Sequence, residues 1–147
     1  MSVGDHRLAD AADRSEINDL LARVAQLADS GTPEEYLACF SDEPVWELVA
    51  AHGLPLDPQI VRGRESLLES VRDRRTAGVQ GPGSHTCHAV QRAAVVVDGD
   101  SARADSIFLY YTHTDQTPLL AALGQYADEF VRVSGEWLLA KRTIRRD

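Results

Sequence analysis

The chain has 147 residues, of which 15 are Lys or Arg and 23 are Asp or Glu, so its formal charge at pH 7 is -8. About 150 residues can bury roughly 68–70% of their unfolded surface around one core, so we expect one globular domain over 1–147, with 1–12 as a flexible leading segment. The acidic balance repels phosphate backbones and anionic lipid, which excludes nucleic acid and membrane surfaces as expected partners.

Signals for secretion, metal binding and nucleotide binding are missing from the sequence. The acidic stretch 1–13 has neither the basic nor the apolar region of a signal peptide, and no stretch approaches the roughly 18 apolar residues of a membrane span. We therefore expect a cytoplasmic protein in which Cys39 and Cys87 are small core hydrophobes, with no disulfide and no metal. The glycines of 78–83 lack the phosphate-loop patterns, so no cofactor is expected.

The first third of the chain predicts two helices. One apolar stripe recurs at helical spacing and consists of Ile17, Leu20, Leu21, Val24, Leu27 and Ala28. This helix is expected to begin near Asp10 or Asp13, whose carboxylates suit an N-cap, and to end near Gly31 in a left-handed conformation. The segment Thr32 to Glu35 then reads as a capping box that opens a short second helix.

The rest of the chain predicts one more helix and an antiparallel meander. The charged helix spans 64–75, after a loop that contains Gly53, Pro55 and Pro58. Segments rich in β-branched and aromatic residues predict strands at 45–49, 88–97, 102–112, 123–133 and 136–144. Tight turns at Asp98-Gly99 and Ser134-Gly135 pair the later strands as hairpins.

Helices followed by a meander predict an α+β fold. We expect a cone-shaped α+β barrel, in which the N-terminal helices pack on the concave face of a curved, mainly antiparallel sheet. The mouth of such a cone is a natural site for a small apolar ligand.

The order of several short motifs resembles the SnoaL-like family of the nuclear-transport-factor-two-like superfamily, which also holds scytalone dehydratase and ketosteroid isomerase. The resemblance spans 14–147. The matching pieces are the opening helix that ends in Asp29, the entry Phe40 to Trp46, Arg62-Gly63, the turn Asp98-Gly99-Asp100, and Gly124 to Arg132 followed by Gly135 and Trp137.

The resemblance implies a catalytic pair. Dehydratase-like members join an aspartate at the end of the first helix to a histidine at the start of the strand after the third helix, and these positions match Asp29 and His88. His88 would be the base and Asp29 its orienting partner, because a carboxylate on one ring nitrogen fixes the tautomer and stabilises the imidazolium. His113 matches a second histidine of the dehydratase-like members.

Alternatives stay open for each of these residues. Asp29 can be a polar group near a helix end, although an acid at a helix C-terminus needs a compensating partner. His85 would replace His88 if the strand register shifted by one, and His113 can equally be a strand-end surface histidine.

The expected substrate-binding residues lie on the predicted strands. They are Trp46, Phe108, Tyr110, Tyr126, Asp128 and Phe130. The aromatic members can be core or pocket wall, and Asp128 can instead form a salt bridge along its strand face with Arg132.

The residues and the resemblance together predict a cofactor-independent lyase or isomerase, of dehydratase, isomerase or cyclase type, that moves a proton on a small, mostly apolar substrate with a carbonyl or hydroxyl group. Ala28 and Leu48 stand where the dehydratase has its water-holding tyrosines, and Val24 stands near the lysine of a related dehydrochlorinase, so neither reaction is supported as such. The alternatives are a non-catalytic binding module and an accessory subunit of an oxygenase. The resemblance also implies a homo-oligomer, most simply a dimer through the outer face of the sheet.

Overall fold

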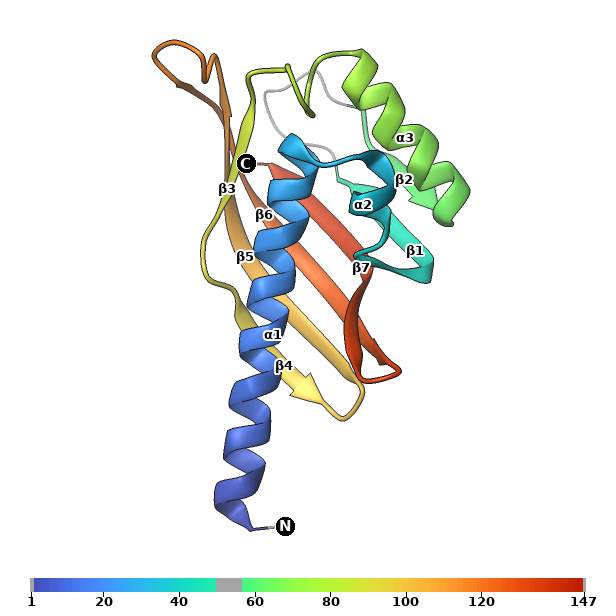
Figure 1. The fold of residues 1–147 in the computed structure, drawn as a ribbon, viewed down its shortest axis with the longest axis vertical. Helices are drawn as coiled ribbons and strands as arrows, with labels where there is room; N and C mark the ends of the chain where they lie inside the picture. Colours follow the sequence, from blue (N-terminus) through green and yellow to red (C-terminus); the bar gives the residue numbers. More distant parts are fainter. Residues whose placement is uncertain (1, 50–56, 147) are drawn as a thin grey trace.

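The computed structural model describes residues 2–49 and 57–146, so the predicted loop residues Gly53 and Pro55 lie outside the described part (Figure 1). Its elements follow the chain in this order: α1 (Val3–Ser30), α2 (Pro33–Leu37), β1 (Phe40–Leu48), β2 (Gln59–Arg62), α3 (Arg64–Thr76), β3 (Cys87–Val90), β4 (Ala94–Asp98), β5 (Ser101–Thr112), β6 (Leu119–Val133) and β7 (Glu136–Arg146).

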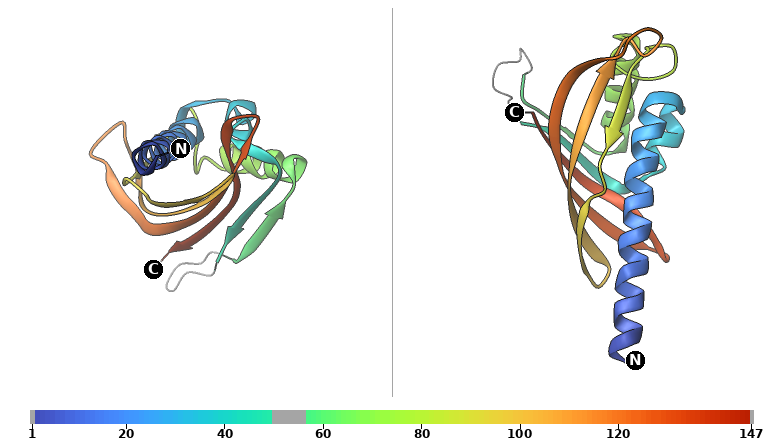
Figure 2. Two further views of the ribbon diagram at one scale, coloured as in Figure 1. Left: turned by 90° about the horizontal axis from the view of Figure 1, so that it is seen from below. Right: turned by 90° about the vertical axis from the view of Figure 1, so that its left-hand side faces the viewer.

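The strands form one curved sheet in the order β2-β1-β7-β6-β5-β3, with β4 also paired to β5. Neighbouring strands are antiparallel except β1 and β7, which run parallel, so the sheet is mixed and open rather than a closed barrel. The helices cover one face, and the sheet curves around α1 (Figure 2). The predicted α+β architecture is confirmed.

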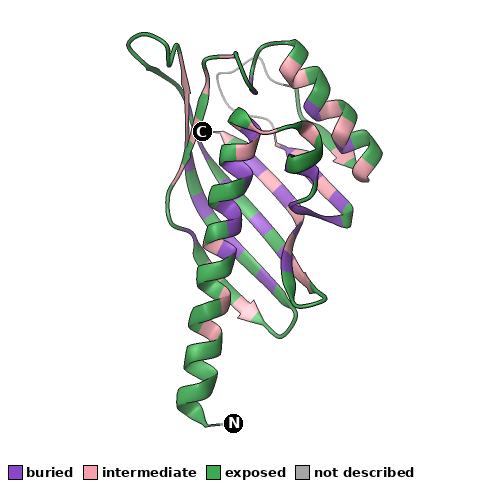
Figure 3. Ribbon diagram, in the orientation of Figure 1, coloured by how far each residue is buried: buried purple, intermediate pink, exposed green. Residues whose placement is uncertain are grey.

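The core lies between the concave face of the sheet and the C-terminal half of α1. Alternate residues of β5 and β6 are buried, as expected when one face of a strand packs and the other is solvated. The predicted stripe of α1 lies over them, and its members Ile17 and Val24 are almost fully buried (Figure 3). The buried apolar residues of α1 therefore begin at Ile17.

The start of α1 differs from the prediction. The helix begins at Val3, where Ser2 and Asp5 form a reciprocal capping box, so a start at Asp10 or Asp13 is wrong and the leading segment is helical. This cap was not recognised because no apolar periodicity follows it within the next turns. The exposed first turns extend past the sheet in Figure 2. At the other end Gly31 is extended, with a φ of -88°, rather than left-handed.

Two strand predictions also need correction. The strand expected at 88–97 is two strands, β3 and β4, because the backbone turns away between them and the N–H of Ala93 donates to the Asn18 side chain of α1 at 2.7 Å. The first strand begins at Phe40 rather than Val45, and the short strand β2 was not predicted. The other predicted elements are confirmed to within a few residues.

Gly124 allows β6 to pass close beneath an aromatic ring of β5. A Cβ atom there would lie 2.5 Å from ring atoms of Phe108 and 2.6 Å from the carbonyl oxygen of Arg145. We predict that Gly124→Ala lowers the free energy of unfolding by roughly 1–3 kcal/mol, because the ring and the strand must move apart. Urea denaturation measures this. Gly4→Ala is the control, since its Cβ meets only Ser2 Oγ at 3.7 Å; an equal loss in both variants would contradict the prediction.

Candidate active site

A cavity of about 280 Å³ lies between the concave face of the sheet and the helices. Helix α1 closes it with Val24, Ala25 and Ala28, while α2 and α3 contribute Tyr36 and Arg74. This volume is at the small end of the range for ligand pockets, so the site suits a small molecule.

Asp29 and His88 meet at the wall of this cavity. The Asp29 carboxylate accepts two hydrogen bonds, one from the His88 backbone N–H at 2.7 Å and one from the ring Nδ1, also at 2.7 Å. Both side chains are about 15% exposed, and the imidazole lines the cavity. Because an ionised carboxylate only accepts hydrogen bonds, Nδ1 carries the proton and the lone pair belongs to Nε2.

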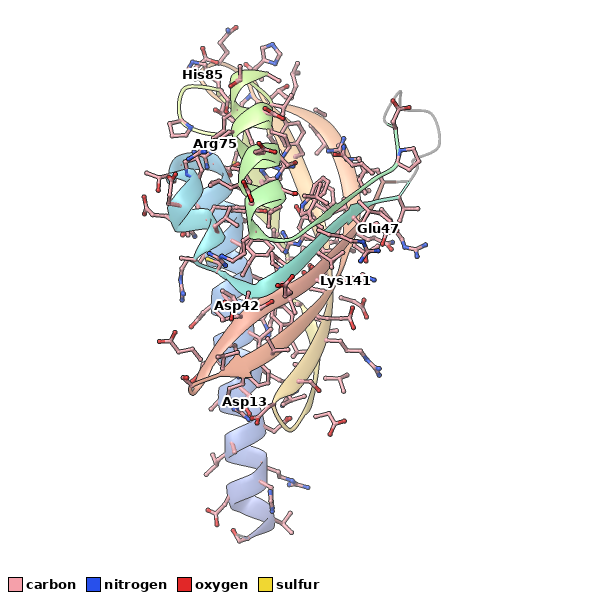
Figure 4. The ribbon with its side chains drawn as sticks, turned by 90° about the vertical axis from the view of Figure 1, so that its right-hand side faces the viewer. Asp13, Asp42, Glu47, Arg75, His85 and Lys141 are labelled. Atoms are coloured by element: carbon pink, nitrogen blue, oxygen red, sulfur yellow. The ribbon has the colours of Figure 1, made fainter. Side chains whose placement is uncertain are left out.

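The fold places the carboxylate by anchoring the end of α1. Arg75 of α3 donates to the carbonyl of Leu27 at 3.1 Å and to the carbonyl of Gly31, on either side of Asp29 (Figure 4). A cation at a helix C-terminus is favourable, and here it offsets the unfavourable placement of an acid in the last turn. Asp29 is therefore compensated in two ways. Arg75 binds the helix backbone near it, and His88 binds its side chain.

Tyr110 supports the histidine from the neighbouring strand. Its ring centroid lies 4.9 Å from that of His88, and its hydroxyl donates to the carbonyl of Val79 at 2.6 Å. Burial raises the pKa of the Tyr110 phenol, although a hydrogen bond with Thr86 and the charge of Arg146 oppose this. The phenol therefore keeps its proton and holds the turn after α3 against the site.

The other two histidines named in the sequence analysis lie outside the cavity. His85 is exposed near one end of the molecule, 4.0 Å from Asp115 (Figure 4), so it does not take the place of His88. His113 is an exposed residue just beyond the end of β5, and its Nδ1 lies 2.9 Å from the hydroxyl of Thr112. The strand ends before this histidine can turn inward, so the structure does not bring it to the Asp29–His88 pair.

Asp128 has a different partner from the predicted one. It is 2% exposed and accepts two parallel hydrogen bonds from Arg142 at 2.9 and 3.0 Å. Arg132 instead binds Asp13 and Asp100 at 2.7 and 3.0 Å. The predicted Asp128–Arg132 bridge is therefore wrong, and Asp13 is a packing partner inside α1 rather than an N-cap.

A β-bulge explains why the sequence did not indicate that Arg142 lines the cavity. Phe130 pairs with Leu139 and Glu129 with Lys141, so Ala140 is an extra residue on β7. The extra residue reverses the inward and outward alternation of the strand, which turns Arg142 into the cavity. Burial acts to lower the pKa of Arg142, but the charge and hydrogen bonds of Asp128 outweigh burial, and the pKa is raised.

The predicted wall residues fall into two groups. Trp46, Phe108, Tyr110 and Tyr126 line the cavity, and the rings of Phe108 and Tyr126 stack at 4.4 Å between centroids. Phe130 is 1% exposed and, like Asp128, does not line the cavity, because both lie deeper in the core. Further lining residues were missed in the sequence analysis: Tyr36, Arg74, Val79, Gln80, Arg142 and Arg146.

Among the described residues, no group of three or more His, Cys, Asp or Glu side chains is arranged to hold a metal ion. Among the helices described, none combines the length and the hydropathy that a bilayer crossing requires.

Comparison with known families identifies the fold family of this chain. The model of the SnoaL-like domain matches residues 9–143. The chain belongs to the SnoaL-like family. No curated protein matches the sequence.

Solved structures of similar fold are distant in sequence. An NTF2-like protein from Novosphingobium aromaticivorans has a TM-score of 0.79 at 22% identity, covering 97% of this chain and 86% of that one. The β subunit of a proposed aromatic-ring-hydroxylating dioxygenase from the same organism has a TM-score of 0.75 at 23% identity, covering 93% and 90%. A Catenulispora acidiphila protein in complex with S-DNPA has a TM-score of 0.72 at 26% identity, covering 93% and 95%.

The buried pair of Asp128 and Arg142 yields a stability prediction. Asp128→Ala should lower the free energy of unfolding by about 3–5 kcal/mol, because it leaves a buried cation without its partner. The double variant Asp128→Leu/Arg142→Met should recover most of this loss. Chemical denaturation measures both. Asp100→Asn, at an exposed partner of Arg132, should change stability far less; a double variant as unstable as the single one would contradict the interpretation.

Cys39 is buried as predicted, but Cys87 is exposed, so the prediction that Cys87 is a core hydrophobe is wrong. The pKa of the Cys87 thiol reports the charge of Asp29. Burial raises the pKa of the Cys87 thiol, and the Asp29 carboxylate raises it further. Asp29→Asn should therefore lower this pKa, so that alkylation of Cys87 by iodoacetamide at pH 8 becomes faster.

Mass spectrometry of the Cys87 peptide across pH separates charge from exposure. In Asp29→Asn the inflection of the rate should move to lower pH while the plateau at high pH stays unchanged. Asp42→Asn removes an exposed carboxylate from β1 and should move neither (Figure 4). If the alkylation rate at high pH rises while the pH of the inflection stays the same, Asp29→Asn has made Cys87 more exposed without changing its pKa.

Proposed function

We propose that this protein is a cofactor-independent proton-transfer enzyme, a lyase or isomerase, that acts on a small carbonyl- or hydroxyl-bearing substrate through Asp29 and His88. The observation that carries the proposal is the 2.7 Å hydrogen bond between Asp29 and His88 Nδ1, on an imidazole that lines a 280 Å³ cavity. General-base catalysis needs an imidazole whose tautomer is fixed by a partner on one nitrogen, so that the other nitrogen can accept a proton from a ligand.

The first step is removal of a proton from a carbon next to a carbonyl group. His88 Nε2 takes the proton, and the electron pair of the C–H bond moves into the carbonyl to form an enolate. The Asp29 carboxylate stabilises the resulting imidazolium without itself accepting the proton. Return of the proton at another carbon gives isomerisation, whereas loss of a β-hydroxyl group as water gives dehydration.

Donors on the opposite wall fit the developing oxyanion. Tyr126 and Arg142 both line the cavity, with the Arg142 guanidinium 3.7 Å from the centroid of the Tyr126 ring. Burial raises the pKa of the Tyr126 phenol, so the hydroxyl stays protonated and can donate. Fixed donors in a site with little water stabilise negative charge without reorganising during the reaction.

The structural neighbour from Catenulispora acidiphila, at 26% identity, was solved in complex with S-DNPA, which supports binding of a small ligand by a chain of this fold. The dioxygenase β subunit, at 23% identity, shares the fold alone, so an accessory subunit is an outcome of the test below. We expect the enzyme to work in the cytoplasm as a homodimer.

Hydrogen–deuterium exchange tests the proton transfer directly. Proton NMR in D2O follows the exchange of the α protons of 2-indanone and 1-tetralone with and without protein. The protein should accelerate exchange, and His88→Ala should lose about 10²- to 10⁴-fold of that acceleration, the usual contribution of a general base. His85→Ala is the matched control, because that histidine is exposed outside the cavity, and it should retain the full rate.

The role of Asp29 is tested by a graded series. Asp29→Asn should lose most of the acceleration without losing ketone binding, and Asp29→Glu should recover part of it because the charge is kept. Circular dichroism checks that each variant is folded. Ketone binding with exchange at the buffer rate in the wild-type protein would reject the enzyme and favour a binding module or accessory subunit.

A further inference from the structure

The cavity carries positive charge that the proton-transfer proposal leaves unused. Arg74, Arg142 and Arg146 line it, and no Asp or Glu is among its described lining residues, although the whole chain has a formal charge of -8. Asp128 neutralises Arg142. Among the described residues, neither of the other two guanidinium groups forms an ion pair with a carboxylate, although Arg74 donates a hydrogen bond to the hydroxyl of Ser70.

The same region holds buried donors without acceptors. Arg74 Nε, Arg146 Nε and Gln80 Nε2 are buried and have no hydrogen-bond partner among the described residues. Gln80 is only 8% exposed, so its amide cannot turn to bulk solvent. An unsatisfied buried donor is unfavourable, and these three belong to side chains that line one cavity, which favours an acceptor group in a ligand of this cavity.

Of these donors, Arg74 lies on the side of the cavity away from His88. Arg74 belongs to α3, which packs on β1 and β2, while His88 belongs to β3 at the opposite edge of the sheet. Arg146 is on β7, where it pairs with Gly124 of β6. The Arg74 guanidinium lies 4.6 Å from the centroid of the Trp46 ring, which fixes its plane.

We propose that the ligand of this cavity is a small aromatic or cyclic carboxylic acid, whose carboxylate accepts hydrogen bonds from Arg74, Gln80 and Arg146. Its ring lies against Phe108 and Tyr126, and its carbon skeleton extends toward His88. A planar carboxylate offers two oxygen atoms to guanidinium and amide donors in the geometry that arginine recognises best. The claim that this ligand is the substrate rests on the proposed function, whereas binding of its carboxylate does not require His88.

The test compares ligands that differ only in charge. Isothermal titration calorimetry measures binding of benzoate and phenylacetate against benzamide and phenylacetamide. The wild-type protein should prefer each acid over its amide by about tenfold to a hundredfold, the range expected for hydrogen bonds to a charged group. Arg74→Gln and Gln80→Leu should each lose most of this preference.

Controls separate local recognition from overall charge. Arg103→Gln removes one positive charge from the exposed outer face of β5 and should keep the preference. In the wild-type protein, the Nε–H signals of Arg74 and Arg146 should shift in ¹⁵N NMR on addition of benzoate and not of benzamide, a readout that does not depend on any variant folding. Equal binding of acid and amide, no binding of either acid, or shifts without preference for the acid would overturn the inference.

The outcome is distinguishable from failure of the proposed function. His88→Ala should keep the preference for acids while it loses proton exchange. If the wild-type protein prefers acids but exchanges the protons of no ketone, the proposed enzyme is rejected and the protein is an acid-binding module. If it exchanges the protons of neutral ketones but does not prefer acids, the proposed enzyme stands and the carboxylate site is rejected.

Discussion

The junction between the end of α1 and the start of β3 is the interaction on which the site depends. One carboxylate, Asp29, accepts both a backbone and a ring hydrogen bond from the same residue, His88. The backbone bond sets where the strand begins relative to the helix, and the ring bond sets the orientation of the imidazole. Packing of Ile17 and Val24 holds the helix on the sheet, and Arg75 holds its last turn. The Asp29 carboxylate therefore both positions the start of β3 and orients the imidazole of His88.

Ionic groups inside the fold follow two different physical patterns. Asp128 and Arg142 are fully paired, with parallel hydrogen bonds that compensate for the loss of hydration. Arg74 and Arg146 have buried Nε atoms without a partner in the described chain. The paired ions contribute to the wall of the cavity, and the two arginines with unpaired Nε atoms line the same cavity. A folded protein retains such unsatisfied donors at the expense of stability, which makes them informative about function.

The sequence analysis predicted those features that depend on local pattern. The stripe of α1, the Thr32 capping box and the two hairpin turns are encoded within a few residues of each other, and the structure has them all. The cavity residues contributed by β7 depend instead on a single inserted residue, Ala140, which reverses the facing of Arg142. The hydrophobic periodicity of a single sequence does not reveal such a bulge, because the pairing with the neighbouring strand determines where the extra residue lies.

Long-range geometry also decided which histidine lies at the cavity. His85, His88 and His113 all occupy strand ends, where sequence alone gives them similar environments. The structure separates them through the path of β3: it begins at Cys87, so His88 pairs opposite Tyr110 and projects inward, while His85 and His113 have positive φ angles of 56° and 57° in the flanking turns. A residue with positive φ breaks the strand alternation. The imidazole that reaches the cavity is thus the one held in regular β structure, where the pairing of β3 with β5 and the hydrogen bonds to Asp29 limit its movement.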